Sequence, residues 1–425
     1  MMFCGSDNGR MREGELSPIP PPQPGPRAAD GRRTLAVTFA GFCAFLGLYA
    51  TQPLLPMLER LFQTSKAAVS LTLTASTLGV ALAAPLVGVV ADRLGRKRVI
   101  VASASLLALA TLLNATATGL PALVFWRFLQ GVFTPGVFAV TVAYVQEEWA
   151  GGGAGRAMAM YVTGSVIGGF VGRMTTGLIV SHWHWRWSFV VIGLLGAASA
   201  LVLQAWLPRE RRFTGRVQGE SPFAGAVAHL RNPRLRAAYA VGFGVLFTLI
   251  ASFTYVTFHL AGEPFRLGPL ALGSLFFTYL VGAVITPYAG HVIDRYGHRT
   301  AMVLAMGTGM GGMLLTLAPS LWMVVAGLAL CCTGVFVAQA ATASYLGVAA
   351  RQNKALAVGL YVTFYYTGGC VGGELPGYLW RFGGWTACVA LVILVQFLTI
   401  AITLAGCTTP AREAGPDLEA LPGFE

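Results

Sequence analysis

The stretch GVVADRLGRKR (residues 88–98) sets the architecture of this chain, because a weaker copy of it, GHVIDRYGHR (290–299), returns 202 positions later. Each copy joins two long apolar segments and combines glycines with an aspartate and basic residues. A second match has nearly the same offset, since Tyr161-Val-Thr163 and the glycines after it recur 200 positions later, from Tyr361. Two independent matches at nearly one offset indicate two repeated halves.

The composition predicts a membrane protein. Of the 425 residues, 55% are hydrophobic and only 11% are charged, whereas soluble domains carry roughly 25% charged residues. So few charges cannot cover a water-exposed surface. Apolar runs such as 71–90 and 389–405 are long enough for a helix of about 20 residues, which crosses a bilayer. We therefore predict an all-α integral membrane protein.

Twelve spans are predicted from the apolar stretches between charged and turn residues, six in each half. They lie near residues 34–56, 67–91, 98–118, 121–145, 157–181 and 188–207, then 237–260, 269–291, 299–318, 320–346, 356–380 and 385–406. The halves are expected at 34–207 and 237–406, with a polar linker loop at 208–236. Residues 1–33, rich in proline, glycine and arginine, and residues 407–425 are expected to be cytoplasmic tails, the first of them disordered.

The basic residues predict the orientation. Twenty-two of the 29 Lys and Arg residues fall on the side that holds both termini, five fall in the loops of the other side, and Arg127 and Arg173 lie within spans. Cytoplasmic loops carry the excess of positive charge, so both termini are expected in the cytoplasm, with the chain in a bacterial inner membrane. The net charge of +12 lies in short loops that face lipid, which argues against a nucleic-acid partner.

These residues resemble the major facilitator superfamily over about residues 34–406. The stretch at 88–98 is similar to the signature loop of that family, and 290–299 is similar to its weaker second copy. Span four is similar to proton-coupled members, especially the twelve-span drug:proton antiporters, at Leu123, Arg127, Gln130 and Gly131. The resemblance implies twelve transmembrane helices in two six-helix, pseudo-symmetric halves that work by alternating access.

Span five narrows the resemblance. Its glycines are similar to the antiporter glycine motif, although Ser165 stands where that motif has proline, so the direction of transport stays open. The paired Tyr-Val-Thr segments, Arg173 and the Glu147-Glu148 pair resemble bacterial acriflavine-sensitivity type exporters.

The resemblance implies that the repeated loop is a gate, which locks the halves together on the cytoplasmic side. Glycines there allow a tight turn and close helix packing, and an aspartate can accept bonds from free amides at a helix N-terminus. The alternative is that the basic residues only set the topology. The predicted gating residues are Gly88, Asp92, Arg93, Gly95, Arg96 and Lys97, with Gly290, Asp294, Arg295 and Gly297 in the second copy.

Glycines in spans five and eleven predict close helix packing. Several recur every four residues, which places them on one smooth face of a helix. Such a face suits sliding of one helix on another, and static packing is an equally weighted alternative. The residues are Gly164, Gly168, Gly169 and Gly172, with Gly368, Gly369 and Gly372 in the repeat.

Three ionisable residues lie within spans: Glu374, Arg173 and Arg127. A charge in hydrocarbon costs at least a few kcal/mol, so each is expected to face protein or a water-filled cavity. Glu374 is the one carboxylate well inside a span, which makes it the first candidate for proton coupling; a structural ion pair or a mouth-exposed position is the alternative. Whether Arg173 and Glu374 pair with each other is left open.

Polar and aromatic residues in spans one and eleven are candidates for the substrate cavity, namely Tyr49, Gln52, Tyr365 and Tyr366. Core packing or interfacial anchoring is the alternative for each. The His182-Trp-His-Trp185 segment lies at a helix end where an aromatic belt is expected, so no metal site is predicted, and no cofactor.

The sequence predicts a transporter rather than an enzyme. No Walker sequence, HExxH or nucleophile elbow occurs, and a GxGxxG match at 307–312 lies in an apolar span without a preceding strand. We expect a monomeric secondary active transporter that exports a small amphipathic solute or drug in exchange for protons. Uptake or efflux of a small polar metabolite such as a sugar or organic acid is the alternative, and a non-transporting sensor is a third.

Overall fold

The computed structural model describes residues 26–149, 153–208, 222–285, 289–350 and 354–407. Every regular element within these ranges is a helix, and seven of the helices are each long and apolar enough to cross a membrane. The prediction of an all-α membrane protein is confirmed.

The first half holds six membrane segments, of which the first is broken. Its elements are α1 (Pro26–Leu46), the 3-10 helix η1 (Gln52–Leu54), α2 (Leu55–Leu61), α3 (Lys66–Leu94), α4 (Arg96–Asn114), α5 (Leu120–Glu148), α6 (Ala154–His182) and α7 (Arg186–Trp206).

The second half holds the other six segments. Its elements are α8 (Pro222–Arg231), α9 (Pro233–Ala261), α10 (Pro269–Ser274), α11 (Phe277–Ile285), α12 (Ala289–Leu315), α13 (Leu321–Ala349) and α14 (Lys354–Gly406). Non-helical glycines divide two of these helices, α12 at Gly297 and α14 at Gly383 and Gly384. Each of the two therefore contains parts of two consecutive segments.

Three predicted boundaries differ from the structure. Helix α1 begins at Pro26, so residues 26–33 are helical rather than part of a disordered tail, and it ends at Leu46 instead of continuing to residue 56. The predicted linker at 208–236 contains α8 and the start of α9. The Asn232 side chain accepts a bond from the Arg234 amide at 3.0 Å, which caps α9. Residues 1–25, 209–221 and 408–425 lie outside the described ranges.

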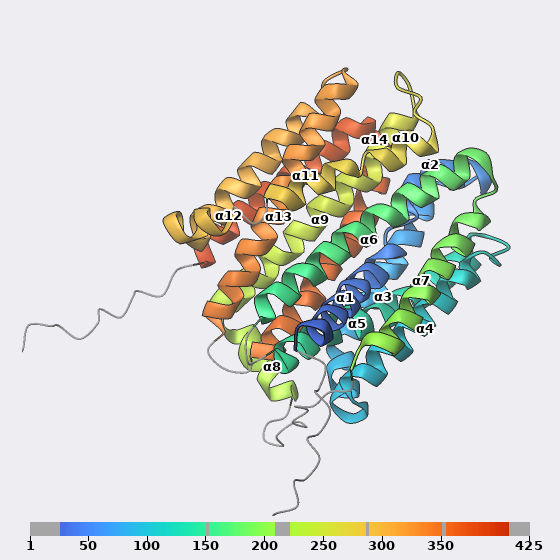
Figure 1. Cartoon of the computed structure of the whole chain (residues 1–425). Helices are drawn as coiled ribbons and strands as arrows, with labels where there is room; N and C mark the ends of the chain where they lie inside the picture. Colours follow the sequence, from blue (N-terminus) through green and yellow to red (C-terminus); the bar gives the residue numbers. More distant parts are fainter. Residues whose placement is uncertain (1–25, 150–152, 209–221, 286–288, 351–353, 408–425) are drawn as a thin grey trace, which may run out of the picture.

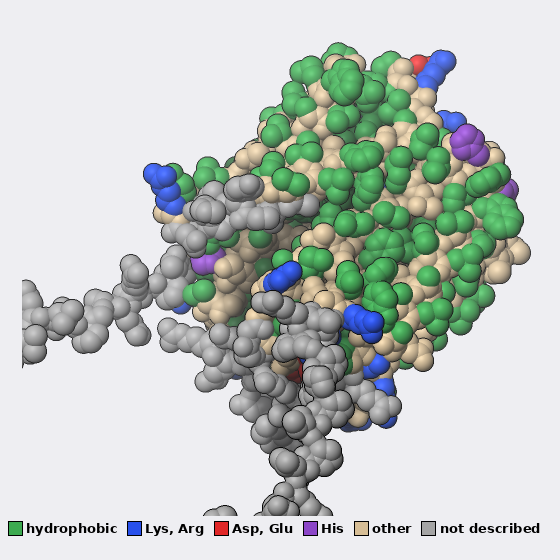
Figure 2. All heavy atoms as spheres, in the orientation of Figure 1, with side chains coloured by type: hydrophobic (Ala, Val, Ile, Leu, Met, Phe, Trp, Pro, Cys, Tyr) green, Lys and Arg blue, Asp and Glu red, His purple; other side chains and the backbone are tan. Residues whose placement is uncertain are grey.

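The two halves lie side by side, with the chain from α1 to α7 on one side and from α9 to α14 on the other (Figure 1). We call the end of the bundle that carries α8 and the α3–α4 junction the terminal face. The end that carries α2 and α10 is the opposite face (Figure 1). On the side of the molecule that Figure 2 shows, apolar side chains with few charges among them cover the helical surface between the two faces, as contact with lipid requires.

The sequence repeat corresponds to a repeat of contacts. A Cβ added to Gly172 of α6 would lie 1.8 Å from the carbonyl oxygen of Leu46 in α1. At the repeated position, a Cβ on Gly372 of α14 would lie 2.6 Å from the carbonyl oxygen of Phe247 in α9. Gly164, Gly168 and Gly368 meet backbone of the same neighbours in the same way. In both halves the glycine face therefore brings two helix backbones into direct contact.

The halves meet closely near the opposite face. A Cβ added to Gly377 of α14 would lie 2.8 Å from Cα of Ala67 in α3, and one on Gly177 of α6 would lie 2.6 Å from the carbonyl oxygen of Pro269 in α10. Between these contacts and the membrane centre, the Thr77 hydroxyl lies 3.3 Å from the Cys370 thiol. Helices α3 and α14, and α6 and α10, thus seal this end of the interface.

The close contact of α6 with α1 at Gly172 can be tested by measuring the stability of a variant. The Gly172→Ala variant should lose about 2 kcal/mol of unfolding free energy, because its Cβ overlaps a carbonyl oxygen on a neighbouring helix. Gly359→Ala is the matched control, since a Cβ there meets no described atom within 4 Å, and it should be neutral or slightly stabilising. Thermal unfolding in detergent measures both, and equal melting temperatures would contradict the packing.

Candidate functional site

Two arginines are enclosed in the membrane interior. Arg127 of α5 is 0% exposed and Arg173 of α6 is 2% exposed. None of the ion pairs formed by the described residues includes either side chain. Each positive charge must therefore be matched by dipoles, rings or hydrogen-bond acceptors.

Arg127 is matched by the break in the first segment. Because α1 ends at Leu46, the carbonyl groups that follow it have no helical partner. Arg127 Nη1 donates to the Gly47 carbonyl at 2.7 Å, and Nη2 donates to the Leu48 carbonyl. Its Nε donates to the Thr72 carbonyl of α3 at 2.9 Å.

Two side chains complete the set. Arg127 Nη2 donates to the Ser76 hydroxyl at 3.0 Å, and Nη1 donates to Gln130 Oε1. Gln130 in turn donates from Nε2 to the Thr111 hydroxyl at 2.8 Å. All five N–H donors of the guanidinium thus have an acceptor, and no carboxylate is among them. This geometry makes Arg127 the group that holds α1, α3 and α5 together at the break.

Arg173 is only partly matched. Its Nε donates to Gln52 Oε1 and its Nη1 donates to the Gly169 carbonyl, both at 2.7 Å. These are the two hydrogen bonds that it makes to described residues. Gln52 also donates from Nε2 to the Thr254 hydroxyl of α9 at 3.3 Å. The Arg173 network therefore crosses from the first half to the second.

Three aromatic rings enclose the Arg173 guanidinium, and we call them the aromatic cage. The Cζ atom lies 4.9 Å from the ring centroid of Tyr49, 4.5 Å from that of Phe276 and 4.8 Å from that of Tyr279. Such distances allow cation–π attraction. Tyr49 follows α1, whereas Phe276 and Tyr279 belong to the α10–α11 region of the second half. The cage is complete only while the halves are closed around it.

The predicted cavity residues come together beside this cage. Tyr49 lies near Tyr366, the Tyr366 ring lies 6.0 Å from that of Phe138 in α5, and the Tyr365 ring lies 5.5 Å from that of Tyr366. Sequence reasoning missed Phe138, Phe276 and Tyr279. They carry no charge and lie in apolar segments, so only the repeat of aromatic residues along facing spans could have indicated them.

Glu374 lies apart from Arg173. It is half-buried on α14, and the exposed Tyr378 lies one turn later. Its Oε2 atom is buried without a hydrogen-bond partner in the described part of the chain. The possible pair with Arg173 does not form here, and Glu374 is less enclosed than the two arginines. Because α14 packs on α3 at the adjacent Gly373, Glu374 nevertheless lies beside the seal between the halves.

The predicted gating loop is held within its own half. Arg96 pairs with Asp92 at 2.7 Å and with Glu147 of α5 at 2.8 Å. Gly95 has a φ of 91°, a conformation that glycine adopts without strain. A Cβ on Gly88 would meet no described atom within 4 Å, so in this conformation no neighbouring helix approaches it. Arg93 is exposed and Lys97 is partly buried.

The second copy of the loop repeats the turn. Gly297 has a φ of 79°, the counterpart of Gly95. Arg295 is exposed, with its Cζ 5.3 Å from the ring centroid of Tyr296. The side chain of Asp294 and the surroundings of Gly290 lie outside the described part.

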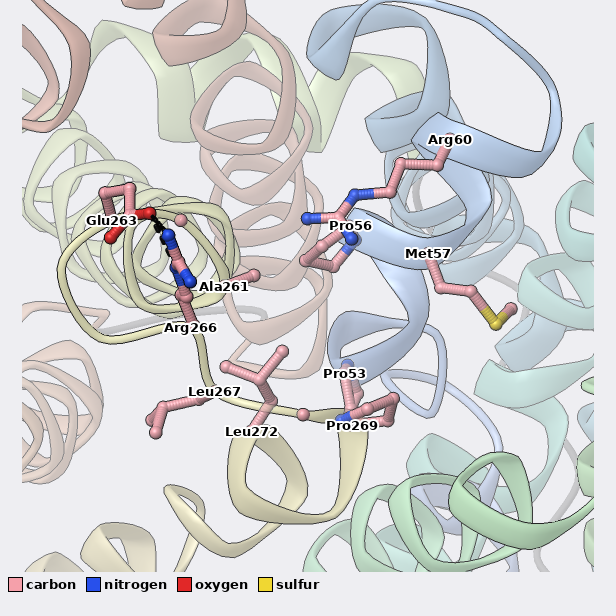
Figure 3. A pocket seen from close by; sticks show the side chains of 12 residues that line it. Pro53, Pro56, Met57, Arg60, Ala261, Glu263, Arg266, Leu267, Pro269 and Leu272 are labelled. Atoms are coloured by element: carbon pink, nitrogen blue, oxygen red, sulfur yellow. Dashed lines mark hydrogen bonds and ion pairs between the residues drawn. The ribbon is translucent and has the colours of Figure 1, made fainter.

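A cavity opens on the opposite face, between α2 and the segment that joins α9 to α10 (Figure 3). Its volume is ≈ 610 Å³, and its lining includes Pro53, Arg60, Arg266 and Leu272. Pro53 follows Gln52 directly, and Leu272 precedes Phe276 by about one turn. The cavity, which we call the vestibule, therefore lies on the outer side of the aromatic cage. Figure 3 shows Arg266 bonded to Glu263, with Arg60 on the facing wall.

Comparison with known proteins gives one consistent result. A model of the family described as Major Facilitator Superfamily matches residues 37–284 and 260–422. The inner membrane transport protein YnfM of Escherichia coli is 32% identical over 372 residues, 87% of this chain and 89% of that protein. The chloramphenicol resistance protein CraA of Acinetobacter baumannii is 28% identical over 42% of this chain and 43% of its own length. The crystal structure of the nucleoside transporter NupG superposes with a TM-score of 0.73, at 14% identity, over 88% of this chain and 99% of that chain.

The two arginines should differ in their contribution to stability. Arg127→Gln removes the five hydrogen bonds of a fully enclosed side chain and should cost on the order of 3 kcal/mol of unfolding free energy. Arg173→Gln removes an incompletely matched charge and should stay within about 1 kcal/mol of wild type. Thermal unfolding of both purified variants tests this, and a larger loss for Arg173→Gln than for Arg127→Gln would contradict the assignment.

Proposed function

The chain belongs to the major facilitator superfamily, and we propose that it is a secondary active transporter that exports a small amphipathic solute in exchange for protons. One observation supports alternating access most directly, namely the unequal closure of the two faces. Near the opposite face, residues 66–81 of α3 are mostly buried, and this part of the helix packs on α14. Towards the terminal face, most of residues 82–90 are exposed. A transporter sealed at one face and parted at the other is one state of such a cycle.

The gating loop fits the same state. Arg96 pairs with both Asp92 and Glu147 within the first half, and Gly88 has open space beside it. In the other state of the cycle, we expect α14 to approach Gly88 and the start of α4 as the terminal face closes. The loop would then join the two halves, as its resemblance to the family signature implies.

The orientation follows from the distribution of positive charge. Because most Lys and Arg residues lie on the side of the termini, the terminal face is proposed to be cytoplasmic and the vestibule external. We place the protein in a bacterial inner membrane. One chain supplies both halves of the gate, so a monomer suffices.

Export is favoured over uptake by the character of the interface and by one relative. Aromatic side chains dominate the region around Tyr49 and Tyr366, and Arg173 contacts the Tyr49 ring. Such a lining suits an amphipathic solute better than a sugar. CraA is named for chloramphenicol resistance, although the similarity to it covers less than half of either chain.

Proton coupling is assigned to Glu374. It is the carboxylate that lies well within a span, one of its oxygens is buried without a described partner, and it lies beside the α3–α14 seal. Protonation would remove a negative charge from this seal, and deprotonation would favour its opening to water. Proton-driven exchange requires that the protonation of one group changes the equilibrium between the closed and the open seal.

Locking the seal should stop transport. The Thr77→Cys variant places a second thiol beside Cys370, where the hydroxyl is now 3.3 Å from the sulfur, and mild oxidation should join the two halves. Proteoliposomes with an imposed pH gradient are followed with acriflavine, chloramphenicol and 3-phenylpropionate, together with lumenal pH. Oxidation should abolish movement of whichever solute is carried, and reduction should restore it.

The matched controls are Thr77→Ser, and Thr77→Cys combined with Cys370→Ser, which cannot form the disulfide and should be insensitive to oxidant. Full transport by the cross-linked protein would exclude alternating access at this seal. If no solute of the panel moves under either gradient, export of an amphipathic solute fails, and polar metabolites become the class to screen.

Neutralising Glu374 should separate exchange from coupling. In Glu374→Gln, solute transport driven by the pH gradient should be at least tenfold slower than in wild type, whereas exchange of solute for solute should continue. The substitution removes only the proton-transfer step. Glu263→Gln changes an exposed loop carboxylate and should behave as wild type. Wild-type proton coupling in Glu374→Gln would place the proton site elsewhere.

A further inference from the structure

We propose that Arg173 binds the anionic group of the transported solute, which makes the substrate class amphipathic organic carboxylates. This inference rests on the proposed transport function and gives it a substrate. The two enclosed arginines differ in their hydrogen bonds. Arg127 has acceptors for all five of its N–H donors, whereas Arg173 has two hydrogen bonds to described residues.

No carboxylate among the described residues pairs with Arg173 to supply the missing acceptors. The side chain is 2% exposed, so little water can reach the remaining donors. The carboxylates that form ion pairs in the described residues, Glu59, Asp92, Glu147 and Glu263, all pair with other bases. An enclosed cation with free donors and no described counter-ion is a site for an anion.

The aromatic cage provides a weak substitute for that anion. Cation–π contacts to a guanidinium are weaker than charge-assisted hydrogen bonds, and they leave the in-plane N–H donors unused. A carboxylate can accept two parallel N–H bonds from the edge of an arginine, a stronger and directional match. A ring that stacks on the face of a guanidinium leaves its edge open to a carboxylate, so ring contact and anion binding are compatible.

The position of the cage explains how an anion reaches it. Tyr49 belongs to the first half, and Phe276 and Tyr279 belong to the second, so rocking of the halves separates the rings and exposes the guanidinium. The vestibule outside the cage is lined by Arg60, Glu263 and Arg266. Arg266 is paired with Glu263, whereas Arg60 has no ion-pair partner among the described residues. The vestibule therefore keeps one positive charge, from Arg60, which favours the entry of anions.

The apolar part of the solute follows from the neighbouring side chains. Tyr49 contacts Arg173 and lies near Tyr366, whose ring is 6.0 Å from that of Phe138 across the interface between the halves. A ring or short alkyl chain attached to the carboxylate would lie against these aromatic surfaces. Arylalkanoates and medium-chain fatty acids combine both features.

Binding to protein in lipid nanodiscs tests the proposal. The probes are 3-phenylpropionate, benzoate and octanoate, each compared with its neutral amide by calorimetry. Wild type should bind at least one acid tenfold or more tightly than its amide. Arg173→Gln should bind the acid and the amide alike, and Arg173→Lys should fall between, since lysine keeps the charge without the planar fork. Arg381→Gln, which removes an exposed charge on α14, should match wild type.

Equal binding of acid and amide by wild type, or an undiminished preference for the acid in Arg173→Gln, would overturn the proposal. Thermal unfolding shows whether Arg173→Gln is folded; if it is not, Arg173→Lys decides, and a preference equal to wild type would count against the site. The two proposals fail separately. Movement of acriflavine or chloramphenicol without acid preference supports transport and rejects Arg173, whereas Arg173-dependent binding without gradient-driven movement supports the site and rejects proton-coupled export.

Discussion

A positive charge enclosed in a membrane protein must be matched, and the two buried arginines meet this constraint differently. Arg127 is matched in full, and two of its five acceptors are carbonyl groups that become available where α1 stops at Leu46. The break and the arginine therefore support each other, since the guanidinium needs acceptors and these carbonyl groups can accept its bonds. The same break turns the chain so that Tyr49 and Gln52 reach Arg173. The candidate site is thus built on the structural arginine.

The duplicated scaffold is symmetric, whereas its charges are not. The glycine contacts of α6 on α1 recur in α14 on α9, and Gln52 bonds to Thr254, the residue 202 positions later, where the halves meet. At the repeat offset of 200, the counterpart of Arg173 is Gly373, next to Glu374. One half therefore carries the cation of the site, and the other carries the carboxylate assigned to protons. The symmetric scaffold allows the two halves to move between two states, and the residues that differ between the halves, Arg173 and Glu374, bind the anion and the proton.

Sequence reasoning reached the features that repeat or stand out chemically. The spans, the loop at 88–98 and the two enclosed arginines were predictable because hydropathy, spacing and buried charge leave signals in one sequence. The end of α1 at Leu46 was not, because no proline or charge marks it and the stabilising group, Arg127, lies about 80 residues away. Phe276 and Tyr279 were missed because an aromatic residue in a span looks the same whether it faces lipid or a cation. Glu374 was expected to be enclosed, yet the structure leaves it half-buried. How far its side chain is buried depends on the rotation of α14 about its own axis, which residue spacing alone does not determine.

The central claim is that the two faces open in alternation around a seal next to Arg173. Pulsed electron paramagnetic resonance of spin labels in lipid nanodiscs tests it most directly. One label pair replaces Arg60 and Arg266 at the opposite face, and a second replaces Arg93 and Arg299 at the terminal face, all of them exposed positions. We expect two populations in which one pair is short while the other is long, shifted by pH or by added 3-phenylpropionate in opposite directions at the two faces. A single unchanging distance for both pairs, or changes of the same sign at both faces, would contradict alternating closure.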